Sequence, residues 1–135
     1  MSETVLERWH AIVKNSDNDA LNALLADDVV FHSPVVHTPQ EGKPITTMYL
    51  TAALFVLGRG DFRYVREVEG PRDAVLEFEA VIDGITINGV DLIRWNDDGQ
   101  IVDFKVMVRP LKAVNMLHQK MGEMLQSFTK GQQSK

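Results

Sequence analysis

One carboxyl group is placed where a binding or active site is expected. Asp91 lies in the run Ile85–Trp95, in which apolar and polar residues alternate. Successive side chains of a β-strand point to opposite faces, and Asp91 is in phase with Ile87 and Ile93, so its carboxyl group should point to the apolar face. A buried carboxylate needs hydrogen-bond donors or a ligand, or it stays protonated with a raised pKa. We therefore expect Asp91 to line a pocket.

A second candidate is His32, which lies in the extended stretch Val29–Val36. Imidazole exchanges protons near neutral pH, so His32 is a candidate general base. Protonated Asp91 or the indole N–H of Trp9 would then hold a developing oxyanion. The alternative is that His32 lies on the solvent side of its strand and that Asp91 is a satisfied buried group. In that case, a hydroxyl or His32 itself would be the hydrogen-bond partner of Asp91.

Composition excludes several classes of function. The chain has 135 residues, and its net charge of -5 comes from 14 basic and 19 acidic residues. Nucleic acids and anionic membranes need a basic face, so we expect neither as a partner. The chain has no cysteine, and no apolar stretch reaches the ~20 residues of a membrane span. We expect a soluble cytoplasmic protein with no cofactor, and we predict no metal because the spacing of His32, His37 and Glu41 fits no established site.

The first half of the chain has helical periodicity. Apolar residues recur at helical spacing over about residues 3–15, and Asp19 is the predicted cap of a short second helix that ends at Asp27. Pro44 suits the first turn of a third helix, which Gly58 ends. These elements come before the alternating segments and should cover one side of the sheet that those segments form.

The second half alternates with period two. We expect strands near residues 62–69, 74–83, 85–95 and 100–109, joined by turns rich in glycine and aspartate. Helical spacing returns over about residues 111–128, and residues 131–135 should form a frayed tail. The fold class is therefore α+β: a curved, cone-shaped antiparallel sheet covered by three N-terminal helices, with an added C-terminal helix. One domain spans residues 1–135, with its core at about residues 3–110.

Two surfaces are open to more than one interpretation. Asp103, Lys105, Met107 and Arg109 alternate away from the apolar face of their strand, and they predict a solvated or dimer-facing strip. The last helix carries Met121 and other methionines, whose soft side chains suit a lid over the cavity or a partner subunit. Ordinary packing of this helix against its own sheet is the alternative.

Two stretches point to a known family: Leu24–Pro34 and Val90–Val102. With the order of helices and strands, they resemble the nuclear transport factor 2-like superfamily, which includes SnoaL-like cyclases and ketosteroid isomerases. The resemblance covers about residues 3–110. It implies a cystatin-like cone whose open end holds a ligand cavity, usually in a homodimer.

The resemblance carries over one catalytic residue. In ketosteroid isomerases an aspartate of the first strand moves the proton, while a tyrosine of the first helix and a protonated aspartate of a later strand stabilise the enolate oxygen. Those places resemble Ser33, Trp9 and Asp91, so only Asp91 keeps its type. A serine cannot replace a carboxylate base. Epoxide hydrolases and SnoaL-like cyclases use an aspartate at a place that resembles Val106, so their chemistry is not implied either.

Two functions remain open. In the first, the protein binds a small, mostly apolar or carbonyl-bearing molecule and catalyses proton transfer, as an isomerase, cyclase or hydrolase, with Asp91 and His32. In the second, it is a non-catalytic, dimeric ligand-binding or accessory protein with an eroded active site. The residues expected to line the ligand cavity in either case are Trp9, Ser33, Tyr49, Phe78 and Phe104.

Overall fold

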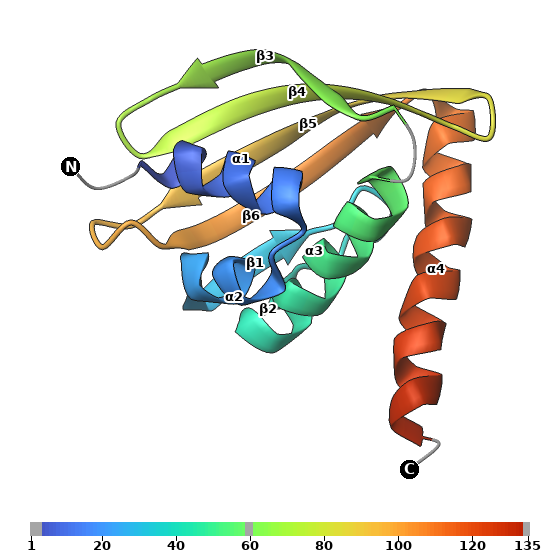
Figure 1. The fold of residues 1–135 in the computed structure, drawn as a ribbon, viewed down its shortest axis with the longest axis horizontal. Helices are drawn as coiled ribbons and strands as arrows, with labels where there is room; N and C mark the ends of the chain where they lie inside the picture. Colours follow the sequence, from blue (N-terminus) through green and yellow to red (C-terminus); the bar gives the residue numbers. More distant parts are fainter. Residues whose placement is uncertain (1–3, 59–60, 134–135) are drawn as a thin grey trace.

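The α+β fold class is confirmed by a computed structural model, which describes residues 4–58 and 61–133, with side chains as far as residue 127. A six-stranded sheet curls around three helices, α1 to α3, and a fourth helix, α4, runs past one end of it (Figure 1). We call the side of the sheet that faces α1 to α3 the concave face and the other side the outer face. The concave face holds the core.

The three N-terminal helices are α1 (Val5–Asn15), α2 (Asn18–Leu24) and α3 (Lys43–Gly58). Residue 3, the predicted start of the first helix, lies outside the described residues, and the helix begins after a capping box in which Thr4 and Glu7 bond each other's backbone N–H. The cap of α2 is Asp17 and not the predicted Asp19, because the Asp17 carboxylate accepts the N–H of Ala20.

The strands are β1 (Leu25–His32), β2 (Gln40–Glu41), β3 (Arg63–Glu69), β4 (Asp73–Ile82), β5 (Ile85–Trp95) and β6 (Ile101–Arg109). Their order across the sheet is β2-β1-β6-β5-β4-β3. Neighbouring strands are antiparallel except β1 and β6, which pair in parallel. The predicted antiparallel pairing of β3, β4, β5 and β6 is confirmed, whereas the parallel pairing of β1 with β6 was not predicted. The N-terminal strand lies beside the last strand, so the two halves of the chain share one sheet.

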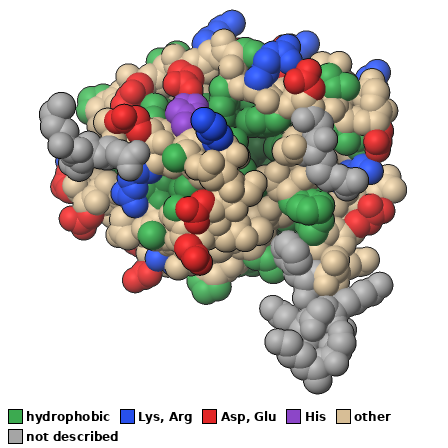
Figure 2. All heavy atoms as spheres, in the orientation of Figure 1, with side chains coloured by type: hydrophobic (Ala, Val, Ile, Leu, Met, Phe, Trp, Pro, Cys, Tyr) green, Lys and Arg blue, Asp and Glu red, His purple; other side chains and the backbone are tan. Residues whose placement is uncertain are grey.

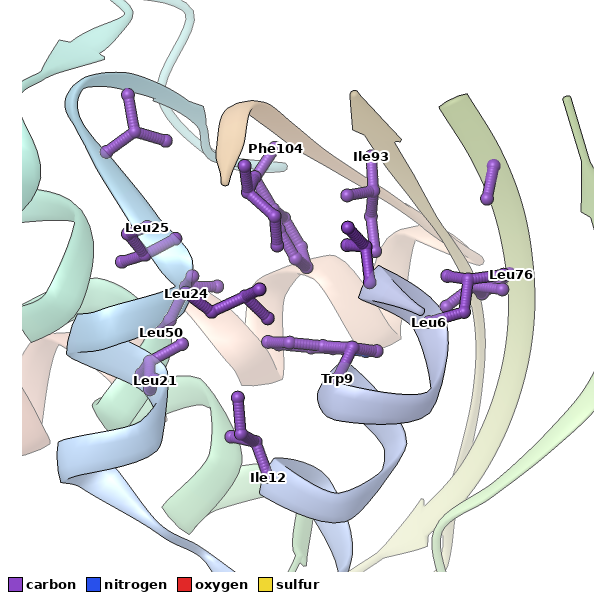
Figure 3. Packing of buried hydrophobic residues seen from close by; sticks show 14 of the residues in the cluster. Leu6, Trp9, Ile12, Leu21, Leu24, Leu25, Leu50, Leu76, Ile93 and Phe104 are labelled. Atoms are coloured by element: carbon purple, nitrogen blue, oxygen red, sulfur yellow. The ribbon is translucent and has the colours of Figure 1, made fainter. Parts of the chain in front are cut away.

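Trp9 lies at the centre of the larger core cluster (Figure 3). Its indole projects from α1 towards the concave face, where its ring centroid is 4.9 Å from that of Phe104. Leu24 and Leu50 close the cluster from α2 and α3, and both are almost completely buried. Burying a large apolar side chain contributes about 1.5–3 kcal/mol, so this cluster fixes α1 against the sheet.

Helix α4 (Leu111–Gln133) joins a second core cluster. Ala113, Met116 and Leu117 are buried there against residues of β4 and β5, and the rest of the helix projects beyond the sheet (Figure 1). The helix is longer than predicted, since it includes residues 131–133 of the expected frayed tail, while residues 134–135 lie outside the described part of the chain. No helix among the described residues is long and apolar enough to cross a membrane.

Candidate active site

Asp91 lies on the concave face of β5, as its phase in the strand predicted. Its neighbours across the sheet are Leu76 on β4 and Val106 on β6, and its side chain is only 6% exposed. The preceding and following residues, Val90 and Leu92, point to the outer face, so the carboxyl group is held inward by the pleat of the strand. Among the described residues, two polar or charged ones are buried, Thr46 and Asp91, and the Thr46 hydroxyl has no hydrogen-bond partner. Asp91 is thus the buried residue of the two that can carry a charge.

A chain of two hydrogen bonds leads to this carboxyl group. The indole N–H of Trp9 donates to the hydroxyl oxygen of Tyr64 at 2.9 Å, and the Tyr64 hydroxyl donates to Oδ2 of Asp91 at 2.7 Å. Helix α1, strand β3 and strand β5 therefore meet at one polar point inside the apolar core. Among the described residues Oδ1 of Asp91 has no hydrogen-bond partner. A ligand can take that place.

Burial shifts the titration of both groups. Removal of the Asp91 carboxyl group from water raises its pKa to about 7, although the hydrogen bond from Tyr64 acts in the opposite direction. Burial and the nearby Asp91 charge raise the pKa of Tyr64 well above its usual value. Tyr64 therefore remains a hydrogen-bond donor at neutral pH, while Asp91 is present in both protonated and ionised forms. A protonated Asp91 can donate its own hydrogen bond to a ligand oxygen.

Asp91 opens into a cavity of about 320 Å³, which we call the Asp91 chamber. Trp9, Tyr64 and Phe104 line it beside the carboxyl group, and the exposed Lys14 and Ser16 lie at its rim. Figure 2 shows a hollow lined with hydrophobic side chains between α1 and α3, on the face that carries both helices. The volume lies at the lower end of the range for small-molecule sites, about 300–1,000 Å³, so the chamber suits a small ligand or one part of a larger one.

A second cavity of about 180 Å³ adjoins the first, and we call it the α4 chamber. Ser33 and Tyr49 line it, together with residues of α4. Ser33 accepts the backbone N–H of Val35, and the Tyr49 ring stacks on Phe31 with centroids 5.4 Å apart. The two chambers have four wall residues in common, namely Ala53, Leu57, Phe78 and Val106. They are thus neighbouring parts of one apolar interior.

Phe78 needs a glycine opposite it to take its position in that wall. Its partner across the sheet is Gly89, and a Cβ atom added to Gly89 would lie 2.4 Å from Cζ of Phe78 and 2.8 Å from the carbonyl oxygen of Met107. Without a side chain at residue 89, the Phe78 ring lies over the backbone of β5. The position of the Phe78 ring, which lines both chambers, therefore depends on the absence of a side chain at residue 89.

His32 lies on the other side of the sheet. Phe31 points into the core, so the next residue along β1 points to the outer face. There His32 pairs with Asp103, with Nε2 2.9 Å from Oδ1, in a shallow depression that also includes Arg94. The structure does not bring His32 and Asp91 together, because the sheet separates them. This is the solvent-side alternative considered from the sequence.

The other predicted residues line the two chambers. Trp9, Phe104 and Asp91 line the Asp91 chamber, Ser33 and Tyr49 line the α4 chamber, and Phe78 lines both. Two residues were missed as site residues. Tyr64 has the same strand phase as Phe62, which was the available signal, and His118 lies on the helix face that Met121 and Leu125 share. Helical spacing places His118 on that face, but spacing alone does not indicate that the face meets a cavity.

The comparison with known families agrees with this architecture. The family model described as a SnoaL-like domain matches residues 6–104. The chain belongs to the SnoaL-like family. No curated protein matches this SnoaL-like chain. The predicted resemblance to the nuclear transport factor 2-like superfamily is confirmed, and the fold, with its curled open sheet, is the cystatin-like fold.

Three solved structures are similar to this SnoaL-like protein. A steroid delta-isomerase from Pseudomonas aeruginosa is 40% identical over 93% of this chain and 92% of its own, with a TM-score of 0.88. An uncharacterised bacterial protein with a cystatin-like fold from Silicibacter pomeroyi is 33% identical over 88% of this chain and 83% of its own, with a TM-score of 0.82. An NTF2-like protein of unknown function from Mesorhizobium loti, 22% identical over 78% of this chain and 88% of its own, has a TM-score of 0.70 and supports the fold alone.

Proposed function

We propose that the protein binds a small, mostly apolar ketone and catalyses proton transfer at a carbon near its carbonyl group. In this proposal the carbonyl oxygen enters the Asp91 chamber and accepts a hydrogen bond from protonated Asp91. The observation that supports it is the buried Asp91 carboxyl group, which lines an apolar chamber and whose second oxygen has no partner among the described residues. Tyr64 and Trp9 position that carboxyl group through the two hydrogen bonds.

The chemistry of an enolate explains why such a group matters. Removing a proton beside a carbonyl group moves negative charge onto the carbonyl oxygen, and a preorganised donor in an apolar site stabilises that charge. Asp91 can be this donor when protonated, and the raised pKa keeps a protonated fraction at neutral pH. The similarity to a steroid delta-isomerase supports isomerisation of an unsaturated ketone as the form of the reaction. His32 has no part in this proposal, because it lies on the outer face.

The first test measures binding of para-nitrophenol, whose phenolate oxygen resembles an enolate oxygen. Replacing Asp91 by Leu should weaken binding by about tenfold to a hundredfold, since a hydrogen bond to a charged group contributes about 1.5–3 kcal/mol. The matched control is Asp103→Asn, which alters a carboxylate on the outer face. Titration followed by the absorbance of the phenolate gives the dissociation constants. Equal affinity for the wild type and Asp91→Leu would contradict the proposed site.

The non-catalytic alternative has one observation in its favour. Ser33 is not a base, and it stands at the place that the resemblance gives to the proton-moving aspartate. Nuclear magnetic resonance in deuterium oxide distinguishes the two functions, because a catalyst speeds the exchange of hydrogen for deuterium beside the carbonyl group of a cyclic ketone. Binding without faster exchange would support a ligand-binding protein.

We also propose that the outer face of the sheet pairs with a second copy of the chain. Met107 is 50% exposed there, and Val75 and Val81 are also exposed. Charged residues of both signs surround them, among them Asp103 and Lys105, so a copy related by a two-fold axis can pair opposite charges. The family resemblance, which implies a homodimer, agrees with this surface.

Replacing Met107 by Glu should disrupt such a dimer. Because both copies carry the substitution, the interface gains two charges, and each loses water without gaining a partner. The dissociation constant of the variant dimer should therefore be about tenfold higher than that of the wild type, or more. Light scattering during size-exclusion chromatography measures the mass against protein concentration. Phe55→Glu, which changes an exposed apolar residue of α3 on the concave side of the sheet, is the control. A wild-type protein that is monomeric at all concentrations would refute the dimer.

A further inference from the structure

The α4 chamber contains a proton-accepting side chain that neither the sequence motifs nor the proposed site includes. His118 of α4 lines this chamber and is exposed to solvent on its other side. Among the described residues that line the chamber, it is the one with a basic side chain. Tyr49 also lies there, but a phenol acts mainly as a hydrogen-bond donor at neutral pH. Imidazole both accepts and releases protons under these conditions.

His118 and Asp91 line two adjoining cavities that have wall residues in common. Leu57 and Phe78 line both chambers, so an elongated ligand whose oxygen binds at Asp91 can extend along these two side chains into the α4 chamber. The lining of that chamber is almost entirely apolar, which suits a hydrocarbon part. Helix α4 is fixed at this end, because Leu117, the residue before His118, is buried against the sheet.

We propose that His118 is the general base that removes and returns the proton of a ketone whose carbonyl oxygen is held at Asp91. The inference rests on the proposed function and adds two points to it. It assigns the missing base to the C-terminal helix, and it defines the ligand as an elongated ketone with a hydrocarbon part in the α4 chamber. Ser33 at the end of β1 lines the same chamber, so the base acts near the place that the aspartate would occupy.

The step balances without a further reactant. An imidazole nitrogen of His118 takes a proton from the carbon between the carbonyl group and an isolated double bond. The electron pair of that C–H bond forms a carbon–carbon double bond, and the π pair of the carbonyl group moves onto the oxygen held by Asp91. When the electrons return, the far carbon of the original double bond takes the proton from His118. The product is the conjugated ketone, and His118 is again neutral.

The test uses the full-length protein and a β,γ-unsaturated cyclic ketone, whose conjugated product absorbs in the ultraviolet. His118→Gln keeps a polar side chain of similar reach but cannot act as the base, and we expect kcat to fall by about a hundredfold or more. The affinity for para-nitrophenol should stay within about twofold, because the variant retains the Asp91 chamber. His37→Gln, which changes an exposed histidine outside both chambers, should leave kcat unchanged. Added imidazole should partly restore the activity of His118→Ala.

The outcomes separate this inference from the proposed function. If the wild type converts the ketone and His118→Gln does so at the same rate, His118 is not the base, while the role of Asp91 stands. If the wild type binds para-nitrophenol but neither converts the ketone nor speeds its deuterium exchange, the catalytic proposal fails, and the role of His118 fails with it. Circular dichroism melting of each variant checks that the fold is retained, and His118→Ala with imidazole rescue gives a second measure of the same role.

Discussion

Replacing Asp91 by Asn should make the protein more stable at alkaline pH. The folded protein keeps the Asp91 proton up to about pH 7, whereas the unfolded chain releases it near the ordinary value of 3.8. Between these values the folded state binds one proton more than the unfolded state, so this group's contribution to the free energy of unfolding falls as the pH rises. Over the whole window the loss is about 4 kcal/mol, at about 1.4 kcal/mol for each pH unit. Asparagine cannot ionise and avoids this loss.

Urea unfolding of both proteins at about pH 5 and about pH 8 measures this effect. The free energy of unfolding of Asp91→Asn minus that of the wild type should increase as the pH rises. In acid the two free energies should approach each other. The same protein concentration throughout removes any contribution from dimer formation. If the free energies of unfolding of the two proteins changed with pH in parallel, Asp91 would titrate like a hydrated carboxylate. The site would then lack the protonated donor that the proposed function requires.

Replacing Phe78 by Ala should cost about 3–5 kcal/mol of stability, which is typical of a buried aromatic side chain. Phe78 is 1% exposed, and its ring packs against Phe62 with centroids 5.3 Å apart and against Tyr64 at 6.4 Å. Its removal also takes away a side chain that lines both chambers. Urea unfolding of Phe78→Ala and of the milder Phe78→Leu measures the loss.

A small apolar compound provides a second measurement on the same variant. If the space vacated by the ring stays open, toluene should bind there and raise the unfolding midpoint of Phe78→Ala more than that of the wild type. Phe78→Leu should respond less, because leucine fills part of the space. A loss of stability below about 1 kcal/mol would mean that the surrounding side chains collapse into the vacated space and that the shape of the chambers does not depend on Phe78.

The sequence predicted Asp91 well because strand phase is a strict constraint. A shift of one residue would turn Ile87 and Ile93 to solvent, so the carboxyl group had to share their face. The same logic applies to β1, where Phe31 is buried and His32 is therefore outward. The hypothesis that paired His32 with Asp91 relied on its closeness to Ser33 along the chain. However, β1 ends at His32, and Ser33 points to the cavity only because the chain leaves the strand there.

Features that depend on distant parts of the chain were not predictable in the same way. Helical spacing predicted α4, but the helix face carrying His118 meets a cavity only because Leu117 packs on the sheet. Tyr64 was recognisable as an inward residue of β3, yet its bond to Asp91 depends on how far the sheet curls. Periodicity gives the direction of a side chain relative to its own element, and it does not give the distance between elements.

The position of β1 beside β6 bears on how the protein is made. Apart from the two-residue strand β2, the sheet partner of β1 is β6, which leaves the ribosome after four other strands. Until then the apolar sides of α1 and α3 have an incomplete surface to cover, and neither chamber has all of its walls. Pairings between distant segments form slowly, because a long loop must close first. The nascent chain therefore cannot complete the sheet before β6 has emerged, and until then it exposes apolar surface that is prone to aggregation.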